Sequence, residues 1–262
     1  MSLYESLRIA INRLGFDVCR VGRERLGRIL PLDLDSLAKG PEIIFDVGAN
    51  TGRAALFYLK HFPRASVYSF EPFQQSFEAL RADGRLASVK AFNVALGSKS
   101  EEAMLHSFEG SELNSLLALD PKASMFLDAD RLESRREVSV RVRTLDDFCE
   151  QHSIGRIDIL KIDTQGYDLE VLRGARDLLA SKRVRVIQVE ANFVSLYCGQ
   201  PRFGDLVEHL SEAGYGLVGL YDVARNPAGD IKWADAVFCQ KIASERPEVD
   251  RNLVLQRPEK SS

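Results

Sequence analysis

Apolar runs expected to form strands alternate with segments of helical spacing, and this alternation constrains the fold more than any other feature. The expected strands are 42–47, 65–70, 88–96, 156–163, 184–190, 215–222 and 235–240. The expected helices between them are 53–61, 73–82, 167–181 and 203–213. Strands separated by helices of this length form βαβ units, in which helices cover both faces of a largely parallel sheet. The sequence therefore predicts an α/β fold.

Residues 97–150 interrupt this alternation with two strand-like pieces around a polar stretch. Ligands of open α/β sheets bind at the carboxyl ends of the strands, and we expect this inserted segment to lie there and shape the binding site. We assign residues 1–38 to an N-terminal helical segment and 39–242 to the α/β domain. Residues 243–262 are polar, have no apolar period and are expected to form a flexible tail.

Charge and cysteine content set limits on partners and location. The net charge of −3 leaves no overall positive field that would attract nucleic acid. The four cysteines lie far apart without a C-x-x-C pair, and no run of 18 apolar residues occurs. We therefore expect reduced thiols and a cytoplasmic location.

The N-terminal 28 residues carry six arginines against three acidic residues. Within them, residues 3–15 place their apolar side chains on one helical stripe. Such a helix either packs on the domain with its basic face in water or makes weak peripheral contact with an anionic membrane or a partner. Both readings stay open at this point.

The stretch IIFDVGANTGR at 43–53 is typical of a strand, a tight glycine loop and the start of a helix. It lacks the spacing and the lysine of the phosphate loop, G-x-x-x-x-G-K-[ST]. Its glycines stand as G-x-x-x-G, not as the G-x-G-x-x-G of dinucleotide sites. Asp46 would repel a pyrophosphate and suits a cationic ligand, such as the ammonium end of S-adenosylmethionine. We expect Gly48 to let the backbone approach the ligand and Gly52 to let the following helix pack closely.

Glu71 and Pro72 follow the second expected strand, 19 residues beyond Gly52. An acidic side chain at this strand end is placed to accept hydrogen bonds from both hydroxyls of a ribose. The feature predicts an adenosine-type ligand. It is shared by dinucleotide and S-adenosylmethionine sites and does not choose between them.

Five stretches resemble, in the same order, the motifs of FkbM-type S-adenosylmethionine-dependent methyltransferases: FDVGANTG, SFEP, VALGS, RVRTLDDF and IDILKIDTQGYDLEVLRGA. The resemblance covers residues 40–191, and its last stretch is the most specific. It implies O-methylation of a hydroxyl on a sugar, glycolipid or polyketide. It also implies a Rossmann-like, seven-stranded sheet whose last strand is antiparallel. Family members commonly have glutamate at the position of Gln165, so this chain lacks one carboxylate there.

The residues expected to contact the cofactor lie in these motifs, except for Ser115 in the inserted segment. They are Asp46, Gly48, Asn50, Thr51, Gly52, Glu71, Pro72, Ala95, Ser115 and Asp163. For Ser115, a capping role is the alternative.

Transfer of an activated methyl group requires an aligned acceptor oxygen and a group that takes its proton. Asp163 ends the fourth expected strand and Glu190 ends the fifth, so neighbouring strands would bring both carboxylates beside the methyl group. Either residue can act as the base or orient the acceptor hydroxyl. In the alternative, Asp163, Glu190 and Asn192 supply oxygen ligands to a magnesium-like ion; we favour the metal-free reading. His106 in the inserted segment is a further candidate base.

The leading prediction is an S-adenosylmethionine-dependent O-methyltransferase that acts on a small-molecule or glycan acceptor. A nicotinamide-dependent reductase is the alternative from another class, but the chain lacks G-x-G-x-x-G and a well-placed Y-x-x-x-K pair. A nucleic-acid substrate is not expected, because no Asn/Asp-Pro-Pro-aromatic turn follows the fourth expected strand.

Overall fold

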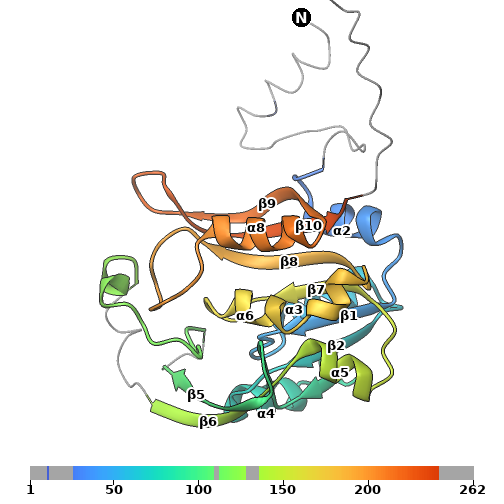
Figure 1. Cartoon of the computed structure of the whole chain (residues 1–262), viewed down its shortest axis with the longest axis horizontal. Coiled ribbons are helices and arrows are strands. Elements are labelled where there is room, and N and C mark those ends of the chain that lie inside the picture. Colours follow the sequence, from blue (N-terminus) through green and yellow to red (C-terminus); the bar gives the residue numbers. More distant parts are fainter. Residues whose placement is uncertain (1–10, 12–25, 109–111, 128–135, 242–262) are drawn as a thin grey trace, which may run out of the picture.

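Seven strands form the main sheet of a computed structural model of the chain (Figure 1). They are β1 (Ile43–Val47), β2 (Ser66–Phe70), β3 (Lys90–Phe92), β7 (Ile157–Ile162), β8 (Val184–Asn192), β9 (Tyr215–Arg225) and β10 (Ile231–Gln240). Their order is β3-β2-β1-β7-β8-β10-β9. Neighbouring strands from β3 to β8 are parallel, whereas β10 is antiparallel to β8 and β9. The predicted sheet, mostly parallel with an antiparallel last strand, is confirmed.

The structure describes residues 11, 26–108, 112–127 and 136–241. Apart from residue 11, the predicted helix at 3–15 lies outside the described residues, and so does the predicted tail at 243–262. Both readings of the basic N-terminal segment therefore stay predictions. Within the described part of the chain, no helix has the length and apolar character needed to cross a membrane.

The direction of β10 follows from the short connection before it. Only residues 226–230 separate β9 from β10, and the amide of Asn226 donates to the carbonyl oxygen of Asp230 across the turn at 2.9 Å. A parallel arrangement would need a crossover of a dozen or more residues, so this connection enforces a hairpin.

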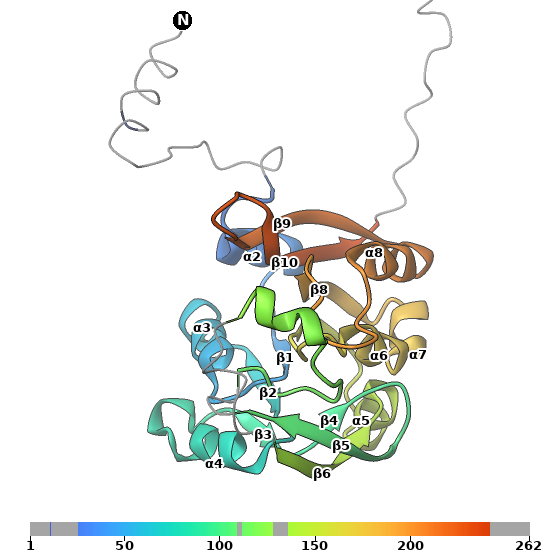
Figure 2. The ribbon, with the colours of Figure 1, turned by 90° about the vertical axis from the view of Figure 1, so that its left-hand side faces the viewer.

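Helices cover both faces of the main sheet, as predicted (Figure 2). One face carries α2 (Leu30–Ala38), α3 (Arg53–His61) and α4 (Gln74–Ala82). The other carries α5 (Leu145–Gln151), α6 (Asp168–Arg173), α7 (Arg176–Ala180) and α8 (Phe203–Glu212). Successive side chains of a strand point to opposite faces, so Ile44 is buried in the first core and Phe45 in the second.

Helix α2 belongs to the layer that covers the sheet. Its Leu34 and Ala38 are fully buried in the core beneath it. The carboxylate of Asp33 accepts a hydrogen bond from the hydroxyl of Tyr221 in β9 at 2.7 Å. The last nine residues of the segment predicted as 1–38, which form α2, therefore pack on the domain.

The prediction of a single strand at 88–96 is wrong. Its first part is β3, whereas β4 (Ala95–Leu96) joins a second sheet of order β4-β6-β5, with β5 (Glu101–Ser107) and β6 (Arg136–Arg143). Between the two parts, the side-chain amide of Asn93 donates to the carbonyl oxygens of Glu71 and Pro72 at 2.9 and 3.0 Å. These bonds turn the chain out of the main sheet.

The predicted helix at 167–181 is two short helices, α6 and α7, that are separated at Gly174. A Cβ at Gly174 would lie 1.9 Å from the carbonyl oxygen of Gly97, so only glycine permits this approach. The Gly174 carbonyl accepts from the amide of Asp146 at 3.0 Å, and this bond to a neighbouring segment accompanies the break.

Gly48 is expected to be sensitive to a single added carbon. A Cβ there would lie 1.9 Å from the carbonyl oxygen of Asp163. Gly40 is a matched control: its φ of 74° is close to the 80° of Gly48, but a Cβ at Gly40 would have no atom within 4 Å. Gly40→Ala should cost about 1–2 kcal/mol through its left-handed conformation alone. Gly48→Ala should lower the free energy of unfolding further, as measured by urea denaturation. Equal losses in the two variants would contradict the steric argument.

Candidate active site

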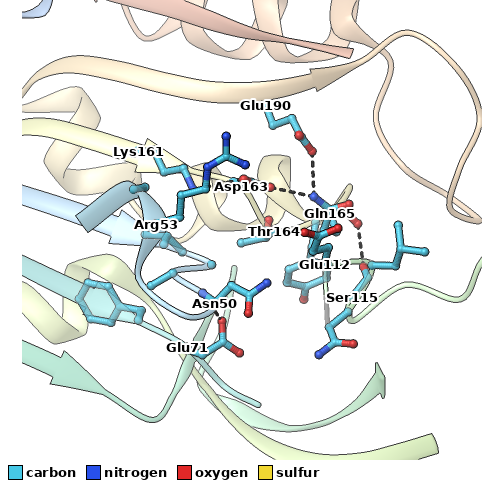
Figure 3. Close-up of a pocket in the computed structure, with 18 of the residues that line it drawn as sticks. Asn50, Arg53, Glu71, Glu112, Ser115, Lys161, Asp163, Thr164, Gln165 and Glu190 are labelled. Carbon is cyan, nitrogen blue, oxygen red and sulfur yellow. Dashed lines mark hydrogen bonds and ion pairs between the residues drawn. The ribbon is translucent and has the colours of Figure 1, made fainter. Parts of the chain in front are cut away.

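A cavity of about 850 Å³ lies at the carboxyl ends of the central strands (Figure 3). Its wall extends from Glu71, which follows β2, to Asp235 in β10, and residues 112–116 of the inserted segment contribute to it. After β1 the chain continues to α3 on one face of the sheet, and after β7 it continues to α6 on the other. The cavity thus occupies the crevice where open α/β sheets bind ligands.

Glu71, the residue predicted to accept from a ribose, lies in this cavity just after β2. It is 6% exposed, and its two carboxylate oxygens accept hydrogen bonds from the backbone amides of Asn50 (2.7 Å) and Phe73 (2.8 Å). Burial raises the pKa of Glu71 to about 7. A carboxylate has about four acceptor positions, so two remain for hydroxyl donors. Thr51, Pro72 and Ala95 line the same cavity.

Gly48 of the glycine loop lines the cavity, and its missing side chain also makes room for the carbonyl oxygen of Asp163 at the end of β7. Packing is therefore a second reason for this glycine, beside the predicted approach of a ligand. A Cβ at Gly52 would lie 2.3 Å from the side chain of Leu86, in keeping with the expected close packing after the loop. Gly52 is not among the residues that line the cavity.

Asp46 does not reach the cavity, contrary to the expectation of contact with the ligand. Its side chain is fully buried, and its Oδ1 lies 3.4 Å from the ammonium group of Lys161. Burial raises the pKa of Asp46, and the charge of Lys161 opposes this rise. In this geometry the one ion pair of Asp46 among the described residues is with Lys161, and its charge also raises the pKa of Glu71.

Lys161 is a site residue that the sequence reasoning missed. Its side chain lines the cavity, is almost fully buried and also lies 3.2 Å from Oδ2 of Asp163. Burial lowers the pKa of Lys161, but the charges of Asp163 and Asp46 outweigh it and raise the pKa overall. A lysine inside the apolar run IDILKI was the available signal, since lysine is rarely buried unless paired.

Gln165 joins the two carboxylates that were predicted to converge (Figure 3). Its Nε2 donates to Oδ1 of Asp163 at 2.8 Å and to Oε2 of Glu190 at 3.0 Å. Its Oε1 accepts from the hydroxyl of Tyr197 at 2.9 Å. The strands β7 and β8 are neighbours, so Asp163 and Glu190 meet as expected. Burial, followed by the charge of Asp163, raises the pKa of Glu190 well above its ordinary value.

The same contacts argue against the magnesium alternative. A metal shared by Asp163 and Glu190 would compete with the N–H donors of Gln165, and the ammonium of Lys161 would repel it. Among the described residues, no group of three or more histidine, cysteine, aspartate or glutamate side chains is arranged to hold a metal ion. Asn192 lines the cavity with Glu190.

His106 does not line the cavity, so its predicted role as a base is not supported. It lies on β5, where its Nδ1 is 3.4 Å from a carboxylate oxygen of Glu137. Its neighbour Leu105 lines the cavity instead. Successive side chains of a strand point to opposite sides, and His106 therefore faces away.

Ser115 lines the cavity, but its hydroxyl is used within the protein. The Oγ donates to the carbonyl oxygen of Gln165 at 2.7 Å and accepts from the amide of Leu117 at 3.0 Å. The geometry thus favours the capping alternative over contact with the cofactor. The bond also holds the backbone of Gln165, whose φ of 54° is left-handed.

Residues 46–217 of the chain match the methyltransferase FkbM domain. The chain belongs to this methyltransferase family. A similar protein is the 2-O-methyltransferase NoeI of Sinorhizobium fredii, 28% identical over 171 residues, which are 63% of this chain and 69% of NoeI. Methyltransferase 1 of Beauveria bassiana is 28% identical over 51% of this chain and 58% of its own length. The 31-O-demethyl-FK506 methyltransferase FkbM of Streptomyces tacrolimicus is 27% identical over 69% of this chain and 75% of its own length.

The family assignment makes the chain a methyltransferase and leaves the reductase alternative without support. The matched part spans little more than half of the Beauveria bassiana relative. Several residues that line the cavity of this FkbM methyltransferase were not predicted from the sequence. They include Arg53, Lys161, Gln188, Asp222, Trp233 and Asp235.

The affinity of this FkbM methyltransferase for S-adenosylhomocysteine should increase with pH. Glu71 has a pKa of about 7, and its ionised form is the better acceptor for ribose hydroxyls. Ionisation of one group with this pKa allows at most a change of about tenfold between pH 6 and 8. Calorimetry should find this increase in the wild type and in the exposed-helix control Glu78→Gln, and not in Glu71→Gln.

The same pKa has the opposite consequence for the unliganded fold. Because the folded-state pKa of Glu71 is raised above 4.5, its contribution to stability is present at low pH and is lost as the pH rises through about 7. For the affinity prediction above, a wild-type affinity for S-adenosylhomocysteine that does not change with pH would show that Glu71 does not hold the ligand.

Proposed function

We propose that this chain transfers a methyl group from S-adenosylmethionine to a hydroxyl group of a small molecule or glycan. The observation that carries the proposal is the buried carboxylate of Glu71, which lies beside the glycine loop and retains acceptor capacity toward the cavity. Two of the similar proteins are named for transfer to oxygen, at a 2-O position and on 31-O-demethyl-FK506.

The wall near β1 and β2 suits the cofactor. Glu71 can accept from the ribose hydroxyls, and the backbone of residues 48–51 forms the adjoining surface. Pro72 and Ala95 add small apolar contacts on the same side. When bound, the cofactor supplies a methyl group already activated on a sulfonium sulfur.

The chain's own residues would align the acceptor and take up its proton. The bond from methyl carbon to sulfur breaks as the bond to the acceptor oxygen forms, and the hydroxyl proton must leave. Burial raises the pKa of Glu190, and a carboxylate with a raised pKa binds a proton more readily. Asp163, with 30% of its side chain exposed, is the second candidate for accepting the hydroxyl proton. A positioned base contributes roughly 10²–10⁴ in rate.

Ligand-dependent melting should distinguish the proposed cofactor from a nicotinamide. S-adenosylhomocysteine at about 100 times its Kd should add roughly 2.7 kcal/mol to the free energy of unfolding. NAD at the same concentration should leave the melting temperature unchanged. Stabilisation by NAD alone would overturn the proposed cofactor.

Amide variants of the two carboxylates test the proposed chemistry. Asp163→Asn should lower kcat by roughly 10²–10⁴ and keep cofactor affinity within about tenfold, since the amide keeps the size and removes the proton acceptor. Glu190→Gln should also lower kcat, and the exposed control Glu208→Gln should not. The rates are measured with an acceptor found by screening with methyl-labelled cofactor.

A chelator distinguishes the two remaining interpretations of Asp163 and Glu190, which are direct contact with the acceptor hydroxyl and binding of a magnesium-like ion. We expect the wild-type rate to be unchanged in EDTA, because Gln165 and Lys161 occupy the neighbourhood of both carboxylates. Loss of activity in EDTA with recovery in magnesium would restore the metal alternative. Full activity in both amide variants would rule the pair out.

A further inference from the structure

The cavity extends well beyond the part assigned to the cofactor. Its wall reaches from the end of β2 across β1, β7 and β8 to β10, which is four strand spacings. At about 4.8 Å per spacing, the distance is roughly 19 Å. The far part is lined by side chains with no role in the proposed chemistry: Gln188, Asn192, Asp222, Trp233 and Asp235.

A buried chain of hydrogen bonds orients Asp235 in this far part. The hydroxyl of Tyr58 donates to Oε1 of Gln188 at 2.8 Å, and Nε2 of Gln188 donates to Oδ2 of Asp235 at 2.9 Å. Tyr58 and Gln188 are buried, whereas the bond from Gln188 to Asp235 is only partly buried and lies at the cavity wall. No described residue hydrogen-bonds to the other oxygen of Asp235, Oδ1.

Asp235 also lies directly opposite Glu190 in the pairing of β8 with β10. Two acidic side chains opposite each other on one face of a sheet are unfavourable unless something lies between or beside them. Burial, followed by the charge of Asp163, raises the pKa of Asp235 to about 6. The fold therefore holds a partly buried carboxylate here, in the wall of the cavity.

Asn192 supplies an independent observation on the neighbouring strand, where it pairs with Trp233, two residues before Asp235. It lines the cavity, and no described residue hydrogen-bonds to its side-chain amide. An amide in this position can both donate to and accept from a ligand hydroxyl.

We infer that Asp235 and Asn192 bind a second hydroxyl of the acceptor, next to the hydroxyl that is methylated. The acceptor's hydroxyl donates to the carboxylate of Asp235, and its oxygen accepts from the amide of Asn192. The site therefore selects acceptors with neighbouring hydroxyls over those with one isolated hydroxyl. The inference rests on the proposed function, because it places the reacting hydroxyl at Asp163 and Glu190.

Two cyclic alcohols that differ by one hydroxyl provide the test. Binding of cis-1,2-cyclohexanediol and of cyclohexanol is measured by NMR on the full chain loaded with S-adenosylhomocysteine. We expect the diol to bind roughly ten to one hundred times more tightly to the wild type, the range of one hydrogen bond to a charged group. Equal binding of the two alcohols would overturn the inference.

Variants assign the preference to the two side chains. In Asp235→Asn, the amide oxygen would take the bond from Gln188 and leave an NH₂ group, which cannot accept, toward the cavity. Asp235→Asn and Asn192→Ala should therefore reduce the preference to about threefold or less. Asp230→Asn, in the exposed turn before β10, should keep it. A preference that survives in both cavity variants would also overturn the inference.

Calorimetry with S-adenosylhomocysteine on the same samples separates this inference from the proposed function. Failure of the wild type to bind the cofactor product would contradict the proposed function and, with it, this inference. Normal binding of the product without a preference for the diol would contradict this inference alone.

Discussion

The ammonium group of Lys161, between Asp46 and Asp163, is the interaction on which the site depends. The parallel register of β1 and β7 places Asp46 directly opposite Lys161. All three groups lie in or beneath the floor of the cavity, where an unpaired charge costs several kcal/mol. The acidic wall formed by Asp163 and Glu190 is tolerated because this positive charge lies below it.

Gln165 links the two carboxylates, Asp163 and Glu190, to the inserted segment. Its amide group bonds to both carboxylates and to Tyr197, while its carbonyl oxygen accepts from Ser115 of the inserted segment. A glutamate here would present acceptors to two carboxylates and lose their shared donor. The amide therefore suits this particular cluster, and it connects the position of the inserted segment to that of Asp163 and Glu190.

The cavity combines two chemical environments. Near β1 and β2, a single buried carboxylate, Glu71, is surrounded by backbone amides and small side chains, which suits a nucleoside. Toward β8 and β10, carboxylates and amides predominate and suit a polar acceptor rich in hydroxyl donors. Methyl transfer requires both environments in one cavity, since the methyl donor and the acceptor must be aligned within it.

Local patterns in the sequence were sufficient for the strands of a largely parallel sheet and for the placement of Glu71, Asp163 and Glu190 at its strand ends, because apolar runs define strands and the residues just after parallel strands meet at one edge. The seven-stranded sheet with its antiparallel last strand was implied by the family resemblance and not by these patterns. The limits of β3 and the break between α6 and α7 were not predictable, because they depend on Asn93 and Gly174 contacting distant segments.

The roles of Asp46, His106 and Ser115 were decided only by the tertiary structure. A local pattern indicates that a polar side chain is near a site, but not whether it faces the ligand or a neighbouring strand. Asp46 faces Lys161, His106 faces Glu137, and Ser115 bonds to Gln165. The sequence determined which strands end at the candidate site residues. Register and packing, which join residues far apart in the chain, decided which of their side chains reach the cavity.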